Sequence, residues 1–371
     1  MQYRVLLIEG NRMMLERLTA VIRDTKDFEL AGRYQKAGDA LKQGGVFHPN
    51  LILLDAEVES NVALIPEFGK AFPSVPVLCM NTRWNAESAS HLVQAGAQGY
   101  LLKPFTRIEL KEAVDTFAKG NMGASSCLIA FFSPKGKSGK TTLIANLALS
   151  LAAKTGDSVG IIDADLQFSD MSVFFNLAPQ STIVEAVRDV HFLSPVTLKP
   201  YYMPVTDRVS VLCGTKKPEY AEMVETKKFA DVLAMSRNLF RYLLVDLPPG
   251  FGPISIAAAE SSHMTILTAS LNGGFEMLQM KRALEIFHDW DDFDERVRAV
   301  FTRVSPCNEE TRQQLEQIVG CRVAGIVPNE YKLVSEAADN GRMAHDISPD
   351  SPLMHSINTI ADRIISSQKA V

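Results

Sequence analysis

Two glycines and three lysines lie within six residues of one another, between an apolar run and a helical run. The segment reads Lys135-Gly136-Lys137-Ser138-Gly139-Lys140-Thr141-Thr142. Glycines allow backbone N–H groups to converge on a phosphate, and the N-terminus of the following helix adds its positive end. In such a loop Lys140 would reach the β- and γ-phosphates, and the hydroxyl of Thr141 would contact Mg²⁺. The segment therefore predicts a site for a nucleoside triphosphate, which we take to be ATP, together with Mg²⁺.

Carboxylates stand at the ends of two later apolar runs. Asp163 ends the run Ser158–Asp163 and is followed by Asp165, and Asp246 ends the run Tyr242–Asp246. A strand-end aspartate beside a phosphate loop holds Mg²⁺ through a water. The first pair could instead form an acidic turn that caps the next helix. Because phosphoryl transfer needs mainly positioning and charge neutralisation, these residue types at the end of a strand suit a metal-assisted nucleotide site.

The elements that must position these residues alternate along the chain. Short apolar runs alternate with helical stretches, which is typical of parallel α/β folds. The strands predicted for a first domain are Tyr3–Glu9, Phe28–Ala31, Leu51–Asp55, Val75–Met80 and Gln98–Leu102, before a helix at Arg107–Ala118. Those predicted for a second domain are Cys127–Phe132, Ser158–Asp163, Val209–Cys213, Tyr242–Asp246, Met264–Thr268, Arg298–Val304 and Val323–Val327, with a helix at Thr141–Ala153. We predict domains at residues 1–118 and 127–371, joined by a small, polar linker at 119–126.

Composition narrows the class of protein. The 371 residues are 46% hydrophobic and 22% charged, which is ordinary for a globular chain of two domains. A net charge of −5 gives no support to a protein that coats nucleic acid. The five cysteines form no Cys-x-x-Cys pair and so indicate neither a zinc nor an iron–sulfur site. No secretory signal opens the chain and no apolar run reaches the length of a bilayer span, so we predict a cytoplasmic protein without membrane insertion.

The phosphate loop has a second lysine at its head and thereby resembles the deviant Walker A loop of the ParA/MinD class of ATPases. The resemblance implies that Lys135 reaches across a dimer to the phosphates of the partner, so that ATP favours a homodimer and hydrolysis is slow. It also implies that Asp165 orients or activates the attacking water and that Asp163 supports the metal shell. Two positions depart from the pattern, because Pro134 replaces a glycine of the general loop and Lys137 replaces a glycine of this class.

Two later segments extend this resemblance toward the base of the nucleotide. The run Ile326-Val327-Pro328-Asn329 matches a strand–Pro–Asp turn that lines the base in the class, with Asn329 in place of the aspartate. The resemblance implies that Pro328 and Asn329 contact the base. Thr302 stands where the class carries an asparagine that reads the adenine edge, which leaves base recognition by this side chain open.

The first domain resembles the receiver domain of two-component response regulators. Asp55 ends the third predicted strand and Lys103 follows the fifth, at the positions of the phosphoacceptor and the phosphate-contacting lysine. The resemblance implies a flavodoxin-like fold with its site at the carboxyl ends of the strands. The acidic pair of the family is reduced to Glu9, because Gly10 occupies the second position. Mg²⁺ is held more weakly when one carboxylate is lost, which favours a degenerate receiver used for docking or dimerisation over phosphorylation at Asp55.

One further landmark of the receiver family is ambiguous in this sequence. The residue aligned with the switch hydroxyl is Asn81, whereas Thr82 would supply a hydroxyl after a shift of one position.

A degenerate receiver in front of a ParA/MinD-like ATPase is the domain order of the TadZ/CpaE family, which localises the machinery of tight-adherence, Flp-type pili. The resemblance implies an ATP-switched, dimerising ATPase whose partners are a second copy and the pilus-assembly or secretion machinery. The alternatives are an ATP-holding scaffold with little turnover and a ParA/MinD-type partition or division-site ATPase. Apolar residues at helical spacing over 353–365 indicate a core helix rather than the basic amphipathic membrane anchor of MinD-type proteins.

Overall fold

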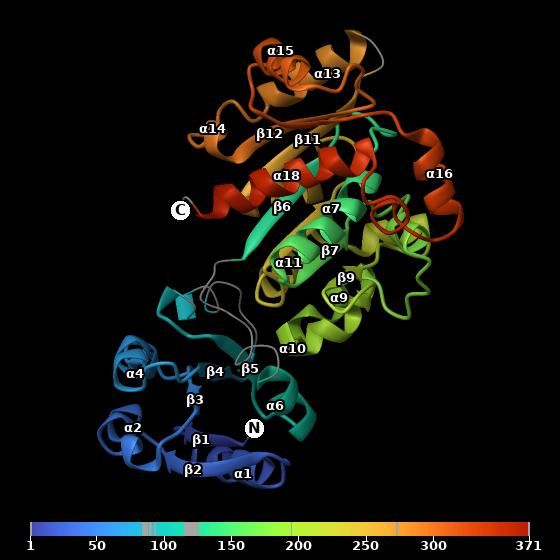
Figure 1. Ribbon diagram of the computed structural model, residues 1–371. Helices are drawn as coiled ribbons and strands as arrows, with labels where there is room; N and C mark the ends of the chain where they lie inside the picture. Colours follow the sequence, from blue (N-terminus) through green and yellow to red (C-terminus); the bar gives the residue numbers. More distant parts are fainter. Residues whose placement is uncertain are drawn as a thin grey trace. The chain divides into compact units, whose positions relative to one another are not determined.

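The structure, a computed structural model, describes residues 2–83, 88, 91–92, 94–114, 126–193, 195–271 and 274–369. The chain divides into two compact units (Figure 1). The first comprises Met1–Ser125 with Asp189–Pro200, and the second comprises Ser126–Arg188 with Tyr201–Val371. The predicted linker at 119–126 lies outside the described residues except for Ser126, so the domain boundaries at 118 and 127 stay predictions.

The first unit is built on a parallel sheet. In the part of the chain that the structure describes, this sheet has five strands in the order β2-β1-β3-β4-β5. The strands are β1 (Tyr3–Ile8), β2 (Phe28–Tyr34), β3 (Leu51–Asp55), β4 (Val77–Asn81) and β5 (Gly99–Leu102). This is the doubly wound, flavodoxin-like order, and the strand order reverses between β1 and β3. Ligand sites form at such a reversal, and here it brings Glu9 and Asp55 to one edge of the sheet.

Helices cover this sheet and close a core around it. Those that the structure describes are α1 (Arg12–Arg23), α2 (Ala37–Gln43), η1 (Gly44–Phe47), α3 (Glu59–Val62), α4 (Ile65–Ala71) and α6 (Arg107–Ala113). The core includes Leu7, Leu18 and Leu53. Thr106 and Glu109 form a capping box that fixes the start of α6, because each side chain accepts a hydrogen bond from the backbone N–H of the other. The last part of the helix predicted to run to Ala118 lies outside the described residues.

The second unit is built on a larger sheet that is parallel except at one edge. Among the described residues it has eight strands in the order β13-β12-β11-β6-β10-β7-β9-β8. The strands are β6 (Cys127–Phe132), β7 (Val159–Asp163), β8 (Met203–Pro204), β9 (Val209–Leu212), β10 (Tyr242–Asp246), β11 (Met264–Ser270), β12 (Val297–Thr302) and β13 (Val323–Val327). The mostly parallel sheet confirms the predicted fold class. The sequence analysis missed the short strand β8, which pairs antiparallel with β9 and carries Pro204 at the sheet edge, where proline is tolerated.

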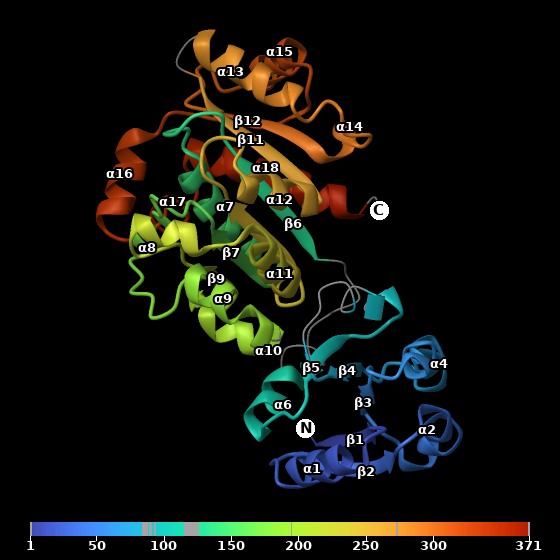
Figure 2. The same cartoon turned by 180° about the vertical axis from the view of Figure 1, so that it is seen from behind.

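Helices lie on both faces of this sheet. Figures 1 and 2 show α7 (Lys140–Thr155) and α18 (Pro352–Lys369) on one face, and α11 (Thr226–Ser236) and α12 (Pro253–Ser261) on the other. The remaining helices among the described residues are α8 (Met171–Phe174), α9 (Ile183–Asp189), η3 (Val190–Phe192), α10 (Pro195–Leu198), η4 (Lys199–Tyr201), η5 (Pro218–Met223), α13 (Gly274–Glu285), α14 (Phe293–Arg296), α15 (Glu309–Val319), α16 (Tyr331–Asp339) and α17 (Ala344–Ile347).

Burial explains why the central strand leads into the phosphate loop. Every residue of β6 is buried, as expected for a parallel strand with helices on both faces. The helix α7 is apolar on nearly all sides and packs against α18, whose residues Met354, Ile357 and Ile360 are buried, as predicted for a core helix.

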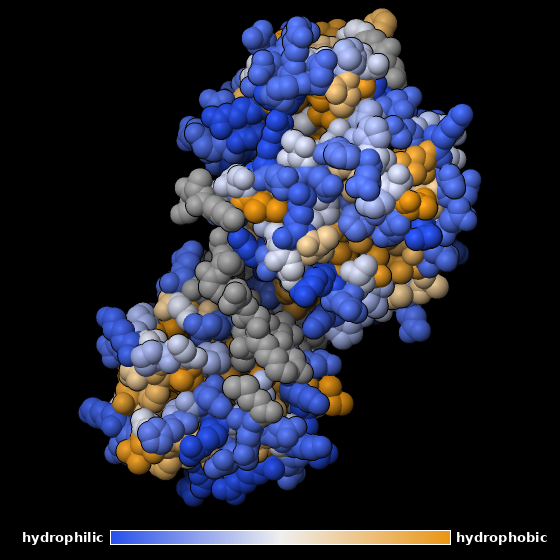
Figure 3. All heavy atoms as spheres, in the orientation of Figure 1, coloured by the Kyte–Doolittle hydropathy of each residue, from blue (hydrophilic) through white to orange (hydrophobic). Residues whose placement is uncertain are grey.

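On the face seen in Figure 3, hydrophilic side chains predominate and hydrophobic ones form separate areas. Across the described ranges, no helix combines the length and the apolar character needed to cross a membrane.

Candidate functional site

The predicted phosphate loop connects the end of β6 to the start of α7. Gly139 stands immediately before α7 with a φ of 77°, in the left-handed region that glycine adopts without steric cost. A β-carbon at this position would lie 3.5 Å from Oγ1 of Thr302, so the loop also passes close to the end of β12. The N-terminal N–H groups of a long helix therefore face the loop, as anion binding requires.

Lys137 also adopts a left-handed backbone, with a φ of 63°. A side chain at this φ places its β-carbon against the following carbonyl, whereas glycine does not. Glycine, which this class carries at the position of Lys137, adopts the left-handed backbone without strain. This chain keeps the left-handed conformation although the residue is lysine.

We expect Lys137→Gly to raise the free energy of unfolding of the second unit by about 1 kcal/mol, because the strain of the left-handed backbone is removed. Chemical denaturation of the full chain measures this change. The matched control is Lys135→Gly, two residues earlier, where the φ is not positive and glycine should lower stability. An unchanged or lower midpoint for Lys137→Gly would contradict the expectation.

The lysine of the loop lies beside the aspartate that ends β10. Lys140 Nζ forms an ion pair with Asp246, and Thr141 Oγ1 donates a hydrogen bond of 2.9 Å to Asp246 Oδ2. Lys140 and Asp246 are buried, with exposed fractions of 6% and 1%. The strand order β6-β10 produces this contact, because adjacent parallel strands end at the same edge of the sheet. Three residues predicted to serve phosphate and metal therefore lie together.

Asp163, at the end of β7, organises the turn that follows it. Its carboxylate accepts hydrogen bonds from Ser169 Oγ at 2.6 Å, from the Met171 N–H at 3.1 Å and from the Asp165 N–H at 3.2 Å. Burial raises the pKa of Asp163 to about 7, and the nearby charge of Asp246 adds to the shift. The structure thus gives Asp163 the turn-holding role that the sequence analysis kept as an alternative, while its role in the metal shell stays a prediction.

The carboxylates of Asp165 and Asp170 both lie near enough to Lys140 to interact with its charge. Burial raises the pKa of Asp165; the charge of Lys140 opposes this rise and that of Asp246 adds to it. Burial and the charge of Asp246 also raise the pKa of Asp170, a residue that the sequence analysis missed. Its only signal in the sequence was its position in the acidic turn after Asp165.

This excess of negative charge fits Mg²⁺, a hard cation that prefers oxygen ligands. Over the residues described, no group of three His, Cys, Asp or Glu side chains is arranged to hold a metal ion by itself. Mg²⁺ at this site would therefore take part of its shell from phosphate oxygens and water, which is its usual mode in nucleotide sites. That Thr141 and Asp246 would hold it stays a prediction, and the structure brings the oxygens of these two residues together.

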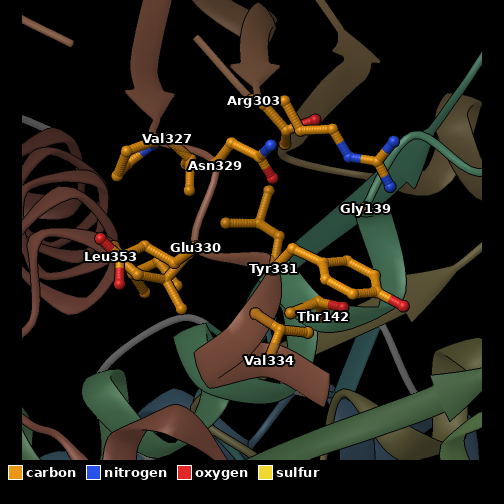
Figure 4. A pocket seen from close by; sticks show the side chains of 13 residues that line it. Gly139, Thr142, Arg303, Val327, Asn329, Glu330, Tyr331, Val334 and Leu353 are labelled. Carbon is orange, nitrogen blue, oxygen red and sulfur yellow. The ribbon is translucent and has the colours of Figure 1, made fainter. Parts of the chain in front are cut away.

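A pocket opens beside the phosphate loop, between the ends of β12 and β13 and the start of α16 (Figure 4). Its lining includes the predicted base-contacting residues Pro328 and Asn329 and, from the loop side, Gly139 and Thr142. The other lining residues are Leu143, Thr302, Arg303, Val327, Glu330, Tyr331, Val334, Leu353 and Ile357. Arg303 follows Thr302 where the class carries the arginine of an Asn-Arg pair, whereas the sequence analysis missed Tyr331, which had no signal beyond its proximity to Asn329.

The remaining loop residues differ in exposure. Ser138 is buried and its carbonyl accepts a hydrogen bond of 2.6 Å from Thr302 Oγ1. Gly136, Lys137 and Lys135 are exposed. An exposed Lys135 at the head of the loop is accessible to a second molecule, as its predicted role requires.

In the first unit, a buried lysine joins the predicted acidic residues. Lys103 Nζ lies 2.7 Å from Glu9 Oε2 and 2.6 Å from Asp55 Oδ1. Burial by itself would lower the pKa of Lys103, but hydrogen bonds to Asp55 and Glu9 outweigh it and raise the pKa. Burial raises the pKa of Glu9 against the opposing effect of Lys103. The ammonium group therefore supplies the positive charge within this pocket.

Glu57, which the sequence analysis missed, links this ion-pair cluster to the switch position. One oxygen of Glu57 lies 3.4 Å from Lys103 Nζ, and the other accepts hydrogen bonds from the hydroxyl and the N–H of Thr82. The amide oxygen of Asn81 is buried and has no hydrogen-bond partner among the described residues. Of the two candidates for the switch hydroxyl, Thr82 is therefore the one that contacts the acidic cluster.

We expect the full chain to gain no mass when it is treated with acetyl phosphate and Mg²⁺. Gly10 brings no carboxylate to the pocket, and Lys103 already pairs with both Glu9 and Asp55, so Mg²⁺ should bind too weakly to support phosphotransfer. Intact-protein mass spectrometry measures the result, and a phosphoryl mass gain at Asp55 would contradict it. In the variant Gly10→Asp the restored carboxylate should increase labelling, because a β-carbon there would lie 3.5 Å from Asp55 Oδ2.

The fold and the site together define a P-loop nucleotide-binding protein that also carries a receiver domain. The model of the CobQ/CobB/MinD/ParA nucleotide binding domain matches residues 129–343, more than half of the chain, and the chain belongs to this family. The model of the response regulator receiver domain matches residues 5–115.

Individual relatives agree with this family. The chain is 27% identical over 248 residues to the uncharacterized ATP-binding protein MJ0547 of Methanocaldococcus jannaschii, covering 65% of this chain and 88% of that protein. Its fold is similar to a ParA family ATPase from Chlorobium tepidum, with a TM-score of 0.59 and 15% identity over 65% of this chain and all of the other. It is also similar to MinD from Pyrococcus horikoshii in complex with Mg-ADP, with a TM-score of 0.55 and 20% identity over 64% and 96% of the two chains.

Proposed function

We propose that this chain is an ATP-switched, homodimerising ATPase with slow turnover. The observation that carries the proposal is the contact of Lys140 and Thr141 with Asp246 at the mouth of a glycine-containing loop. Bound Mg²⁺ would neutralise phosphate charge and hold the phosphates in place. Thr141 and Asp246 would hold this ion, and the backbone N–H groups of residues 136–142 would bind the phosphates.

The remaining residues of the site take separate roles. Lys140 would leave Asp246 for the β- and γ-phosphates once the metal neutralises that carboxylate. Asp165 would orient the attacking water, and Asp163 would keep the turn in place through Ser169. Lys135 would contact the phosphates of the partner, so that hydrolysis depends on dimerisation.

We further propose that the switch localises pilus-assembly machinery of the tight-adherence type, in the manner of the TadZ/CpaE family. The support is the order of a receiver unit with an altered acidic pair before a ParA/MinD-type nucleotide-binding unit. In this proposal the protein works in the cytoplasm and is recruited to a pole or membrane site through protein partners. The receiver unit would act by docking, because Lys103 already pairs with the Glu9 and Asp55 carboxylates of its acidic pocket.

A second candidate is a scaffold that holds ATP with little or no turnover. Pro134 and the left-handed Lys137 favour it, because both depart from the loop pattern of the class that hydrolyses ATP in the proposed mechanism.

Four measurements test these proposals. Analytical ultracentrifugation with ATP, ADP or no nucleotide should show dimers with ATP alone, and phosphate release should separate the slow enzyme from the scaffold. The same proportion of dimer with ATP, with ADP and without nucleotide would overturn the proposed switch. A fluorescent fusion should localise in cells with the pilus genes and become diffuse in cells without them. Co-sedimentation with nonspecific DNA or lipid would instead favour a partition or division-site ATPase.

A further inference from the structure

Thr302 has its hydroxyl group committed to the phosphate loop. Its Oγ1 donates a hydrogen bond of 2.6 Å to the carbonyl oxygen of Ser138, and only 5% of the residue is exposed. A hydroxyl has one proton to donate, so this group has no donor left for a ligand in the adjacent pocket. Thr302, which lines the pocket, can therefore offer a bound base only an acceptor and not a fixed pair of donor and acceptor.

Asn329 and Glu330, which line the pocket, can satisfy the hydrogen-bond pattern of more than one base. The carboxamide of Asn329 has a donor and an acceptor, and a rotation of half a turn exchanges them. It can face N6 and N1 of adenine or, after this rotation, O6 and N1 of guanine. The carboxylate of Glu330 accepts from the amino group of either base. Both residues line the pocket.

The two longest side chains of the pocket suit stacking. Figure 4 shows Arg303 extending from the end of β12 and Tyr331 from the start of α16, on two sides of the pocket. An aromatic ring binds any base through its π-face, and a guanidinium group stacks on a base in the same way. Tyr331 is 72% exposed and makes no contribution to the core, which leaves its ring available for a ligand.

From these observations we propose that the pocket holds the purine by stacking against Tyr331 and Arg303 and discriminates little between adenine and guanine. The chain would then bind GTP nearly as tightly as ATP. This inference rests on the proposed function, because it requires the phosphate loop to hold the triphosphate.

Fluorescence titrations of the full chain with mant-ATP and mant-GTP, both with Mg²⁺, test the inference. We expect the two Kd values to agree within about tenfold, since a site with a fixed hydrogen-bond pattern would reject the wrong base by several orders of magnitude. ATP binding that is more than a hundredfold tighter than GTP binding would overturn the inference and leave the proposed function standing. Binding of neither nucleotide would overturn both.

A pair of tyrosine variants tests the stacking itself. Tyr331→Ala should weaken mant-ATP and mant-GTP by a similar factor of about ten or more, as loss of an aromatic stacking partner does. Tyr220→Ala, which removes a partly exposed tyrosine outside the pocket, is the matched control and should leave both Kd values unchanged. Unchanged affinities in Tyr331→Ala, or a loss confined to one nucleotide, would overturn the inference.

Discussion

Lys135→Ala should lower the rate of ATP hydrolysis by about a thousandfold while ATP binding to the monomer changes little. A cationic side chain supplied in trans to a transferring phosphoryl group contributes about 10³–10⁵ in kcat in related chemistry. Lys135 is exposed at the head of the loop, whereas Lys140 is buried against Asp246, so the two lysines cannot replace each other. ATP-dependent dimers should also be lost. Steady-state phosphate release and analytical ultracentrifugation measure the two effects.

The control for this variant is Lys227→Ala, which removes an exposed lysine from α11 in the same unit and leaves the loop intact. It should hydrolyse ATP and dimerise like the unmodified protein. If Lys135→Ala also does both at the normal level, Lys135 has no role in trans, and the coupling of hydrolysis to dimerisation is wrong.

Lys103→Met should destabilise the receiver unit by about 3–5 kcal/mol, the usual cost of removing one partner of a buried ion pair. The substitution leaves Glu9 and Asp55 facing each other in a buried pocket without their cation. Hydrogen exchange of peptides from β1 and β3 in the full chain measures the loss in this unit separately from the other. Lys111→Met, on the exposed side of α6, is the matched control and should change stability by less than about 0.5 kcal/mol.

This loss of stability should depend on pH in a stated direction. Burial already raises the pKa of Glu9 in the folded protein above its ordinary value of 4.5, and loss of Lys103 removes the hydrogen bond that opposes this rise. A carboxyl group with a raised folded pKa binds its proton more readily when folded, so stability falls as pH rises through that pKa. Lys103→Met should therefore be least stable near pH 8 and recover part of its stability toward pH 5. Equal destabilisation at both pH values would contradict this account.

The sequence was sufficient for the features that depend on local pattern. The fully buried strands β3, β6 and β10 appear as continuous apolar runs, and the glycines and lysines before α7 are contiguous, so strand ends and phosphate loop could be predicted from neighbouring residues. The fold class of both units followed, because apolar runs that alternate with helical stretches have few other ways to bury their faces. The antiparallel strand β8 escaped prediction because two residues carry no periodicity.

Tertiary structure alone decided which side chains meet. Thr302 contacts Ser138 across 164 positions and Lys103 contacts Glu9 across 94, and neither spacing has meaning until the strand order places the strand ends side by side. The same holds for the contact of Glu57 with Thr82, for the carboxylate of Asp170 near Lys140, and for the left-handed backbone of Lys137. The sequence thus determined that this protein has a phosphate loop behind a receiver-like unit. Packing determined that Lys103 pairs with Glu9 and Asp55 and that the Thr302 hydroxyl bonds the phosphate loop, because hydrogen bonds and ion pairs depend on distances in space rather than on spacing along the chain.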